Sequence, residues 1–246
     1  MNIRFVQNIK FTFVILLGVW LIITTSLVLI MTWGNRIAHA EIGMGTGLIL
    51  IWVFLCGSLM YFFRERIKAV VLSLRLNWQI KFILFATLLA MLEEAITTSL
   101  TNLAPLFGVK VGEAYITASA NYLDVILHHS VIVFIPWFIA WAWLLKRYAF
   151  STFSVFLLIG FNGLLAETLT FGLQHLSEFG VWIFVYGLMI FLPAYTVPQD
   201  RGALPPKFKH FLLAFILPFL CGIPWAILIH LISPNHPDIH FPPIKP

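Results

Sequence analysis

Seven long apolar runs constrain this chain more than any other feature of its sequence. Each run has about 20 residues, the length that an α-helix needs to cross the hydrocarbon core of a bilayer. The runs cover residues 11–33, 46–63, 80–105, 126–145, 152–173, 180–198 and 210–232. Lipid offers no hydrogen-bonding partners to the backbone, so each run has to satisfy its own amides as a helix. The sequence therefore predicts an all-α, polytopic membrane helix bundle of about seven transmembrane helices in one domain.

Composition agrees with this prediction and excludes several other classes of protein. With 61% hydrophobic and 10% charged residues, the chain is too apolar for a soluble globular domain. Its two cysteines, Cys56 and Cys221, both lie inside apolar runs, so the sequence supports neither a disulfide framework nor a CxxC motif. The net charge is +5, but the basic residues flank the apolar runs, which favours membrane topology over nucleic-acid binding.

The basic residues also predict an orientation. If the seven runs alternate in direction, 12 of the 15 Lys and Arg fall on one side of the membrane: Arg4, Lys10, Arg64, Arg66, Lys68, Arg75, Lys81, Lys146, Arg147, Arg201, Lys207 and Lys209. Only Arg36, Lys110 and Lys245 fall on the other. Cytoplasmic loops carry the excess of Lys and Arg, which predicts a cytoplasmic N-terminus and an outer C-terminus. The proline-rich tail 233–246 is expected to be an extended segment on the outer face.

Two adjacent carboxylates, Glu93 and Glu94, lie inside the third run. A charged side chain at that depth costs roughly 2.5 kcal/mol or more, so it is a functional-site hypothesis by default. In the fifth run, Gly160, Gly163 and Glu167 share one helix face, and the glycines allow a neighbouring helix to approach closely. We expect the two glutamate faces to meet. The alternative is a structural role, in which these acids are hydrogen-bonded to hydroxyls of neighbouring helices.

Four histidines complete the set of candidate residues. His128 and His129 open the fourth run from its outer side, with Asp124 one turn before them, while His175 and His230 end outward-going runs. These residues are therefore expected near the level of the glutamates. A glutamate can take a proton from water while a neutral histidine stabilises the oxyanion of an attacked amide. Histidines at a membrane boundary are also ordinary, so an interfacial role without chemistry stays the alternative.

Glutamate and histidine are also ligands for zinc, so a divalent metal remains open as a cofactor. The sequence offers little local support for one. Its one His-x-x-x-His spacing joins His236 to His240, and Pro237 argues against the helix that such a motif needs. In an extended chain, His236, Asp238 and His240 would project on one side. A solvated polar tail is the favoured interpretation of this segment.

Several of these residues resemble the motifs of the CAAX-protease and bacteriocin-processing family of intramembrane proteases. The first motif is Glu93-Glu94, with Thr98 where that family has arginine. The second is Phe171-Gly172-Leu173-Gln174-His175, and the third centres on His230 with Asn235 one position further than in the family. The resemblance implies glutamate-activated water that attacks a peptide bond within the membrane, with Glu94 or Glu93 as base and His175 and His230 as oxyanion donors.

Three classes of function fit these patterns. The first is an intramembrane hydrolase, a protease or a related enzyme, whose substrate is a membrane-embedded peptide or lipid and whose candidate residues are Glu93, Glu94, Glu167, His128, His129, His175 and His230. The second is a carrier or channel in which Glu94 and Glu167 bind a proton or cation. The third is a membrane scaffold subunit. Membrane lipid is a partner in every case, and the oligomeric state stays open.

Overall fold

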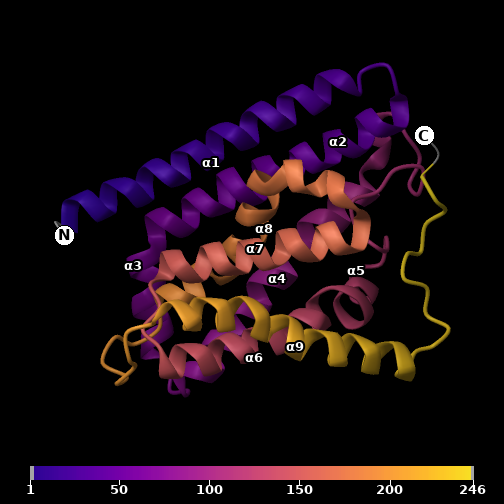
Figure 1. Ribbon diagram of the computed structural model, residues 1–246. Helices are drawn as coiled ribbons and strands as arrows, with labels where there is room; N and C mark the ends of the chain where they lie inside the picture. The colour runs from indigo at the N-terminus through magenta and orange to yellow at the C-terminus, as the bar shows by residue number, and fades with distance from the viewer. Residues whose placement is uncertain (1–2, 245–246) are drawn as a thin grey trace.

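The computed structural model of this protein is a bundle of long helices (Figure 1). It describes residues 3–244, with the surroundings of side chains described from residue 8 onward. The elements are α1 (Ile3–Met31), α2 (Arg36–Leu48), η1 (Ile49–Cys56), α3 (Gly57–Ser73), α4 (Trp78–Asn102), η2 (Ala104–Phe107), α5 (Tyr122–Asp124), η3 (Val125–His129), α6 (Val131–Arg147), α7 (Thr152–Phe171), η4 (Leu173–Glu178), α8 (Phe179–Tyr195) and α9 (Phe208–Ile232). Between residues 3 and 244 there is no strand, only two isolated bridges. The predicted all-α class is confirmed.

Five helical stretches are long and apolar enough to cross a membrane: Asn8–Met31, Arg36–Ser73, Thr152–Phe171, Leu173–Tyr195 and Phe208–Ile232. A sixth is added if the bent pair Tyr122–His129 and Val131–Arg147 counts as one span. These helices indicate a multi-pass membrane protein, with five or six spans by length and composition where the sequence predicts seven. The remaining predicted span, 80–105, is α4, whose second half is polar and buried inside the bundle.

The second predicted span, 46–63, is much shorter than the helix that contains it. In the structure α2, η1 and α3 join into one stretch of 38 residues, from Arg36 to Ser73. At about 1.5 Å per residue this stretch is about 57 Å long, far more than the thickness of a hydrocarbon core. Both of its ends therefore extend beyond the apolar layer. Hydropathy marks only the part of a helix that lies in lipid, so the apolar run 46–63 is shorter than the helical stretch that contains it.

The fourth predicted span, 126–145, contains a break. The π-helical turn η3 ends at His129, α6 starts at Val131, and the two parts meet at an angle of 49°. The amide of Ser130 donates to the carbonyl of Val125 (3.1 Å), which closes the wide turn. This turn sets the directions of the side chains just before α6.

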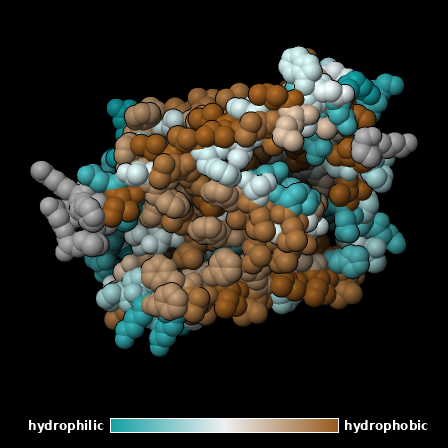
Figure 2. All heavy atoms as spheres, turned by 45° about the horizontal axis from the view of Figure 1, so that its top comes forward, coloured by the Kyte–Doolittle hydropathy of each residue, from teal (hydrophilic) through white to brown (hydrophobic). Residues whose placement is uncertain are grey.

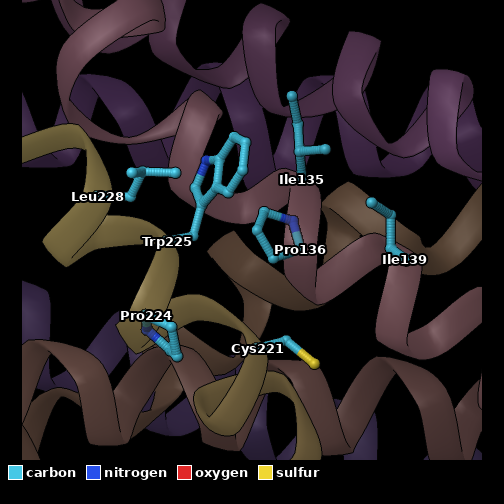
Figure 3. A pocket seen from close by; sticks show the side chains of 7 residues that line it. All are labelled: Ile135, Pro136, Ile139, Cys221, Pro224, Trp225 and Leu228. Carbon is cyan, nitrogen blue, oxygen red and sulfur yellow. The ribbon is translucent and has the colours of Figure 1, made fainter. Parts of the chain in front are cut away.

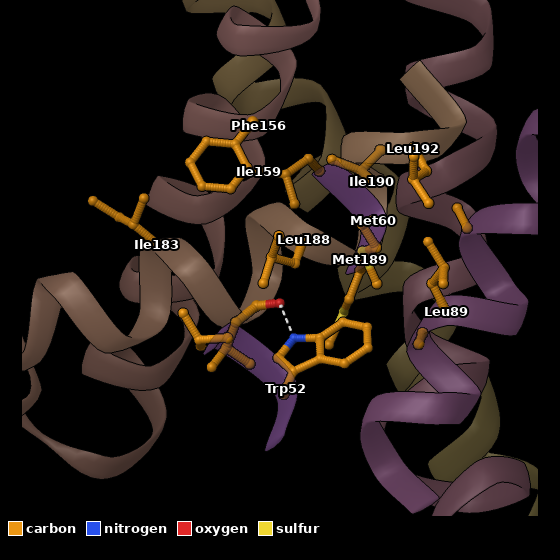
Figure 4. Close-up of a cluster of buried hydrophobic side chains, with 14 of the residues drawn as sticks. Trp52, Met60, Leu89, Phe156, Ile159, Ile183, Leu188, Met189, Ile190 and Leu192 are labelled. Atoms are coloured by element: carbon orange, nitrogen blue, oxygen red, sulfur yellow. Dashed lines mark hydrogen bonds between the residues drawn. The ribbon is translucent and has the colours of Figure 1, made fainter. Parts of the chain in front are cut away.

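Hydrophobic side chains of η1, α3, α4, α7 and α8 fill the centre of the bundle (Figure 4). Trp52 is fully buried there, and its indole NH donates to the carbonyl of Val185 (3.0 Å). Apolar side chains also cover much of the outside, where they form a hydrophobic band between two ends with more hydrophilic residues (Figure 2). An apolar exterior over an apolar core is what a bilayer requires of a helix bundle.

The tail that follows α9 crosses one end of the bundle (yellow in Figure 1). From Ser233 to Ile244 it contains no helix, and its last two residues, Lys245 and Pro246, lie outside the described residues. The tail lies against the loop between η2 and α5. The amide of His240 donates to the carbonyl of Ala118 (2.8 Å), and the ring of Phe241 stacks on that of Tyr115 (4.7 Å between centroids).

Candidate functional site

Three glutamates from two helices form a buried cluster. Glu93 and Glu94 on α4 are only 4% and 8% exposed, and Glu167 on α7 lies close enough to both that the negative charges would repel one another. The hydroxyl of Tyr186 on α8 donates to a carboxylate oxygen of Glu167 (2.5 Å). We call Glu93, Glu94 and Glu167 the carboxylate cluster. α4 and α7 both pack against α8 here, and their carboxylates interact electrostatically; direct contact between the two glutamate faces stays a prediction.

Hydroxyl groups surround the Glu94 carboxylate. Thr97, one turn further along α4, donates to Glu94 Oε2 (3.0 Å). Thr117 from the loop before α5 and Ser130 from the start of α6 also face this carboxylate, although the Ser130 hydroxyl completes no hydrogen bond. The hydroxyl of Tyr122 donates nearby to the carbonyl of Met91 (2.7 Å). The hydrogen bond from Thr97 fixes one oxygen of the Glu94 carboxylate, as a base or an ion ligand needs.

Further polar side chains extend from the carboxylate cluster toward α2. His175 and Glu178 on η4 are hydrogen-bonded (Nδ1 to Oε2, 2.8 Å), and the indole NH of Trp182 donates to the same oxygen of Glu178 (3.0 Å). Glu167 interacts electrostatically with His175, and so does Glu41 on α2. A line of ionisable groups thus leads from Glu41 to Glu94. Glu41 and Glu178 were not among the residues predicted from the sequence.

A second group of ionisable side chains gathers four of the chain's eight histidines. His128 and His129 on η3 surround the carboxylate of Asp124 together with His236 and His240 of the tail. We call these five residues the histidine cluster. The nearest nitrogen to Asp124 oxygen distances are 3.3, 3.7, 2.9 and 2.8 Å, in the order of the histidines along the chain. One ligand atom from each of Asp124, His129, His236 and His240 lies within 4.8 Å of the others, so these four residues could hold a metal ion.

The structure separates the predicted histidines. His128 and His129 belong to the histidine cluster. His175 does not; it interacts electrostatically with Glu167 of the carboxylate cluster. His230, on the last turn of α9, is exposed and belongs to neither group. Asp238 is exposed as well, so the tail contributes its two histidines without the aspartate between them.

Sequence reasoning missed Asp124, His236 and His240 as one site with His129. Two signals were present: the one-turn spacing of Asp124 and His128, and the His-x-x-x-His spacing in the tail. Neither signal reveals that the tail returns to the start of the fourth span, more than 100 residues earlier in the chain. That return is a property of the tertiary structure.

An open apolar groove between α6 and α9 is a separate feature (Figure 3). Its lining residues are Ile135, Pro136, Ile139, Cys221, Pro224, Trp225 and Leu228. The groove contains no carboxylate or imidazole, so it offers no group for acid–base chemistry. Its composition is that of a lipid-facing surface.

Comparison of this chain with family models, with curated proteins and with solved structures finds no match. The chemistry of the site therefore has to be argued from its own residues. Of the residues that resemble the intramembrane-protease motifs, Glu93, Glu94 and His175 belong to one line of polar groups, and His230 does not. The line supplies buried carboxylates, a phenol and an imidazole, which are groups that transfer protons and stabilise an oxyanion.

Proposed function

We propose that this protein is a membrane-embedded hydrolase that cleaves a peptide bond of a membrane-embedded substrate, with the carboxylate cluster as its catalytic centre. One observation carries the proposal: the buried Glu93 and Glu94 interact electrostatically with the half-buried Glu167 of a second helix, which accepts a hydrogen bond from Tyr186 and interacts with His175. Carboxylates in an apolar interior are costly, so such a concentration favours a function that uses them.

The arrangement suggests a division of roles. Glu94, held by Thr97, takes a proton from a water molecule whose oxygen attacks the carbonyl carbon of the substrate. The resulting oxyanion is stabilised by the imidazole of His175, while Tyr186 donates its one proton to Glu167 and holds that carboxylate in place. The proton on Glu94 then passes to the leaving amine, and the carbon–nitrogen bond breaks to yield a carboxylic acid and an amine.

The core of the bundle favours this hydrolase over a carrier. A carrier needs a polar path that reaches both faces of the membrane. Along α4, the turns that precede Glu93 bury Leu89, Ala90, Ala86 and Phe82 before the next buried charge, Lys81. This apolar segment favours a site that opens to one side of the membrane only.

We further propose that this side is the outer one. Thr117, which faces Glu94, lies in the loop before α5. This end of the bundle also carries the α1–α2 turn and the tail, while the turns at the opposite end carry most of the Lys and Arg (Figure 1). The excess of basic residues places the opposite end in the cytoplasm. The N-terminus is then cytoplasmic and the C-terminus outside.

Cleavage by purified variants in lipid vesicles tests the hydrolase proposal. The substrates are a set of transmembrane peptides, each with a fluorophore and a quencher on opposite sides of the scissile region. We expect Glu94→Gln to lower cleavage at least about 100-fold, because an amide cannot accept the proton of water. Glu65→Gln, an exposed carboxylate on α3, is the matched control and should cleave as the parent does. The proposal fails if Glu94→Gln and Glu167→Gln both retain the activity of the parent, or if the parent cleaves none of the peptides.

A further inference from the structure

The histidine cluster has contacts that hydrogen bonding alone does not explain. The nitrogens of His236 and His240 lie 2.9 and 2.8 Å from oxygens of Asp124. Even so, Asp124 Oδ2, His129 Nε2 and His236 Nε2 are buried and lack a partner with hydrogen-bond geometry. A buried polar atom without a partner costs roughly 1–3 kcal/mol. Several such atoms aimed at one point are better explained by a ligand that satisfies them together.

The distances in the histidine cluster suit a small metal ion. Bonds of about 2.0–2.1 Å from a tetrahedral ion to nitrogen and oxygen place neighbouring ligand atoms about 3.3 Å apart. His240 Nε2 and His129 Nε2 lie 2.8 and 3.7 Å from Asp124 Oδ2, which brackets that value, and His236 Nε2 lies 2.9 Å from Oδ1. The four ligand atoms lie within 4.8 Å of one another, so a bound ion would draw them slightly together. Imidazole nitrogens favour zinc and similar transition metals over calcium or magnesium, which prefer oxygen ligands.

The backbone of η3 brings Asp124, just before it, and His129, at its end, to the same side of the helix. Asp124 and His129 are five residues apart, which corresponds to the i to i+5 spacing of a π-helical turn. An α-helical turn would align Asp124 with His128 instead. The π-helical turn therefore lets both imidazoles approach the same carboxylate, with His128 against the ring of His236 (4.1 Å between centroids). π-Helical turns occur frequently at functional sites.

The tail supplies the other two ligands and covers part of the proposed catalytic centre. The amide of His240 donates to the carbonyl of Ala118, and the neighbouring Thr117 faces the Glu94 carboxylate. An ion that joins His236 and His240 to Asp124 and His129 would therefore hold the tail on the loop that borders the carboxylate cluster.

We propose that Asp124, His129, His236 and His240 bind a transition-metal ion of the zinc type, and that this ion holds the tail against the loop between η2 and α5. The site is distinct from the carboxylate cluster and does not depend on the hydrolase proposal. With one carboxylate and three neutral imidazoles, the ligand set leaves a bound divalent ion with a net charge of +1, which suits a site at the end of the bundle better than one in its apolar centre.

Metal titration of the full chain tests this site. The protein is purified with a tag that contains no histidine, stripped with a chelator and titrated with Co²⁺, whose absorption reports its coordination, and then with Zn²⁺. We expect one equivalent of each ion, with Zn²⁺ displacing Co²⁺. Asp124→Asn, His236→Ala and His240→Ala should each weaken binding at least tenfold. His230→Ala, an exposed histidine at the end of α9, is the matched control and should bind as the parent does.

Hydrogen exchange of the tail provides a second measurement that does not depend on the folding of the ligand variants. In the parent and in His230→Ala, Zn²⁺ should slow the exchange of amides in residues 235–241 at least several-fold. The proposal is overturned if the parent binds no stoichiometric metal, if Asp124→Asn binds as tightly as the parent, or if Zn²⁺ leaves the exchange of the tail unchanged. A pattern of several weak equivalents that is insensitive to Asp124→Asn would show adventitious binding to surface histidines only.

Discussion

At the scale of single residues, one ion pair fixes the loop that precedes α5. Arg36, at the start of α2, donates to both carboxylate oxygens of Glu113 (3.2 and 3.4 Å) and to the carbonyl of Gly108 (2.9 Å). The backbone amide of Lys110 also donates to Glu113 (2.7 Å). These contacts, the Arg36 side chain first, lower the pKa of Glu113 below its ordinary value. The pair lies in the loop that leads to Thr117 and Ala118.

The pKa of Glu113 predicts a pH-dependent contribution to stability. Because the folded-state pKa lies below the unfolded one, the contribution is complete above the ordinary carboxylate pKa and is lost as the pH falls through the lowered value. Parent and Glu113→Gln should therefore differ slightly in unfolding temperature at pH 7 and converge as the pH falls well below 4.5. The difference should be small, since exposed ion pairs contribute little. A difference that stays constant over this pH range would mean that the charge of Glu113 is not responsible.

For single residues, the sequence identifies the carboxylates inside apolar runs but not the side chains that they contact. Glu93, Glu94 and Glu167 stand out because carboxylates are rare in apolar runs, and the structure buries or half-buries all three. Histidines carry no such signal, because they are common near membrane boundaries. Sequence alone therefore could not separate His128 and His129, which meet Asp124, from His230, which stays exposed.

At the scale of elements, glycines decide how closely α7 and α8 approach. A Cβ atom on Gly160 would lie 2.7 Å from the backbone carbonyl oxygen of Ile183, and one on Gly163 would lie 2.1 Å from the ring of Tyr186. Both distances are shorter than any real contact. The face of Gly160, Gly163 and Glu167 was predicted to admit a close neighbour, and α8 is that neighbour. The absence of a side chain on Gly163 also leaves the space from which Tyr186 reaches Glu167.

Substitution of Gly163 tests this packing. Gly163→Ala should displace the Tyr186 ring and its hydrogen bond to Glu167, at an overpacking cost of about 1–3 kcal/mol. Gly45→Ala is the control, because a Cβ on this helical glycine meets no atom within 4 Å. Alanine favours helix over glycine, so the control should keep or raise stability. Thermal unfolding in detergent measures both; equal unfolding temperatures for the two variants would contradict the packing that the structure describes.

Helix boundaries were the least predictable property at this scale. Apolar runs located the helices, because lipid requires a helix wherever the chain is apolar. They did not reveal that α2 to α3 continues from Arg36 to Ser73, or that a π-helical turn ends at His129. A hydropathy profile does not distinguish a polar helical turn at the end of a span from a loop. A π-helical turn depends on the packing around it, which hydropathy does not report.

At the scale of the whole molecule, the two ends of the bundle differ in chemistry. One end has α5 and the tail, which contribute residues to the histidine cluster, and the turns at the other end carry most of the Lys and Arg (Figure 1). A hydrophobic band lies between two ends with more hydrophilic residues (Figure 2). This polarity predicts the orientation of the protein. In a variant whose Cys56 and Cys221 are replaced by alanine, a single cysteine at Asn235 should react with a membrane-impermeant maleimide in intact cells. A single cysteine at Asp200 should react only after the cells are permeabilised.

The same labelling experiment distinguishes an inverted orientation from an incorrect number of membrane spans. The reverse pattern would show that the orientation is inverted, with the clusters facing the cytoplasm. Labelling of both positions from one side would show that α9, which connects them, does not cross the membrane. Either result would leave the helical fold itself unchanged.

The sequence by itself determined that this chain is helical, that its helices suit a membrane, and that a few carboxylates lie among them. These are local properties, because a bilayer acts on each segment separately through its hydrophobicity and its need for backbone hydrogen bonds. Only the tertiary structure decided which polar groups meet. The close packing of α7 on α8 brings Glu167 to Tyr186, and the π-helical turn before α6 and the path of the tail bring His236 to Asp124. Such meetings depend on packing between distant segments, which no local pattern in the sequence specifies.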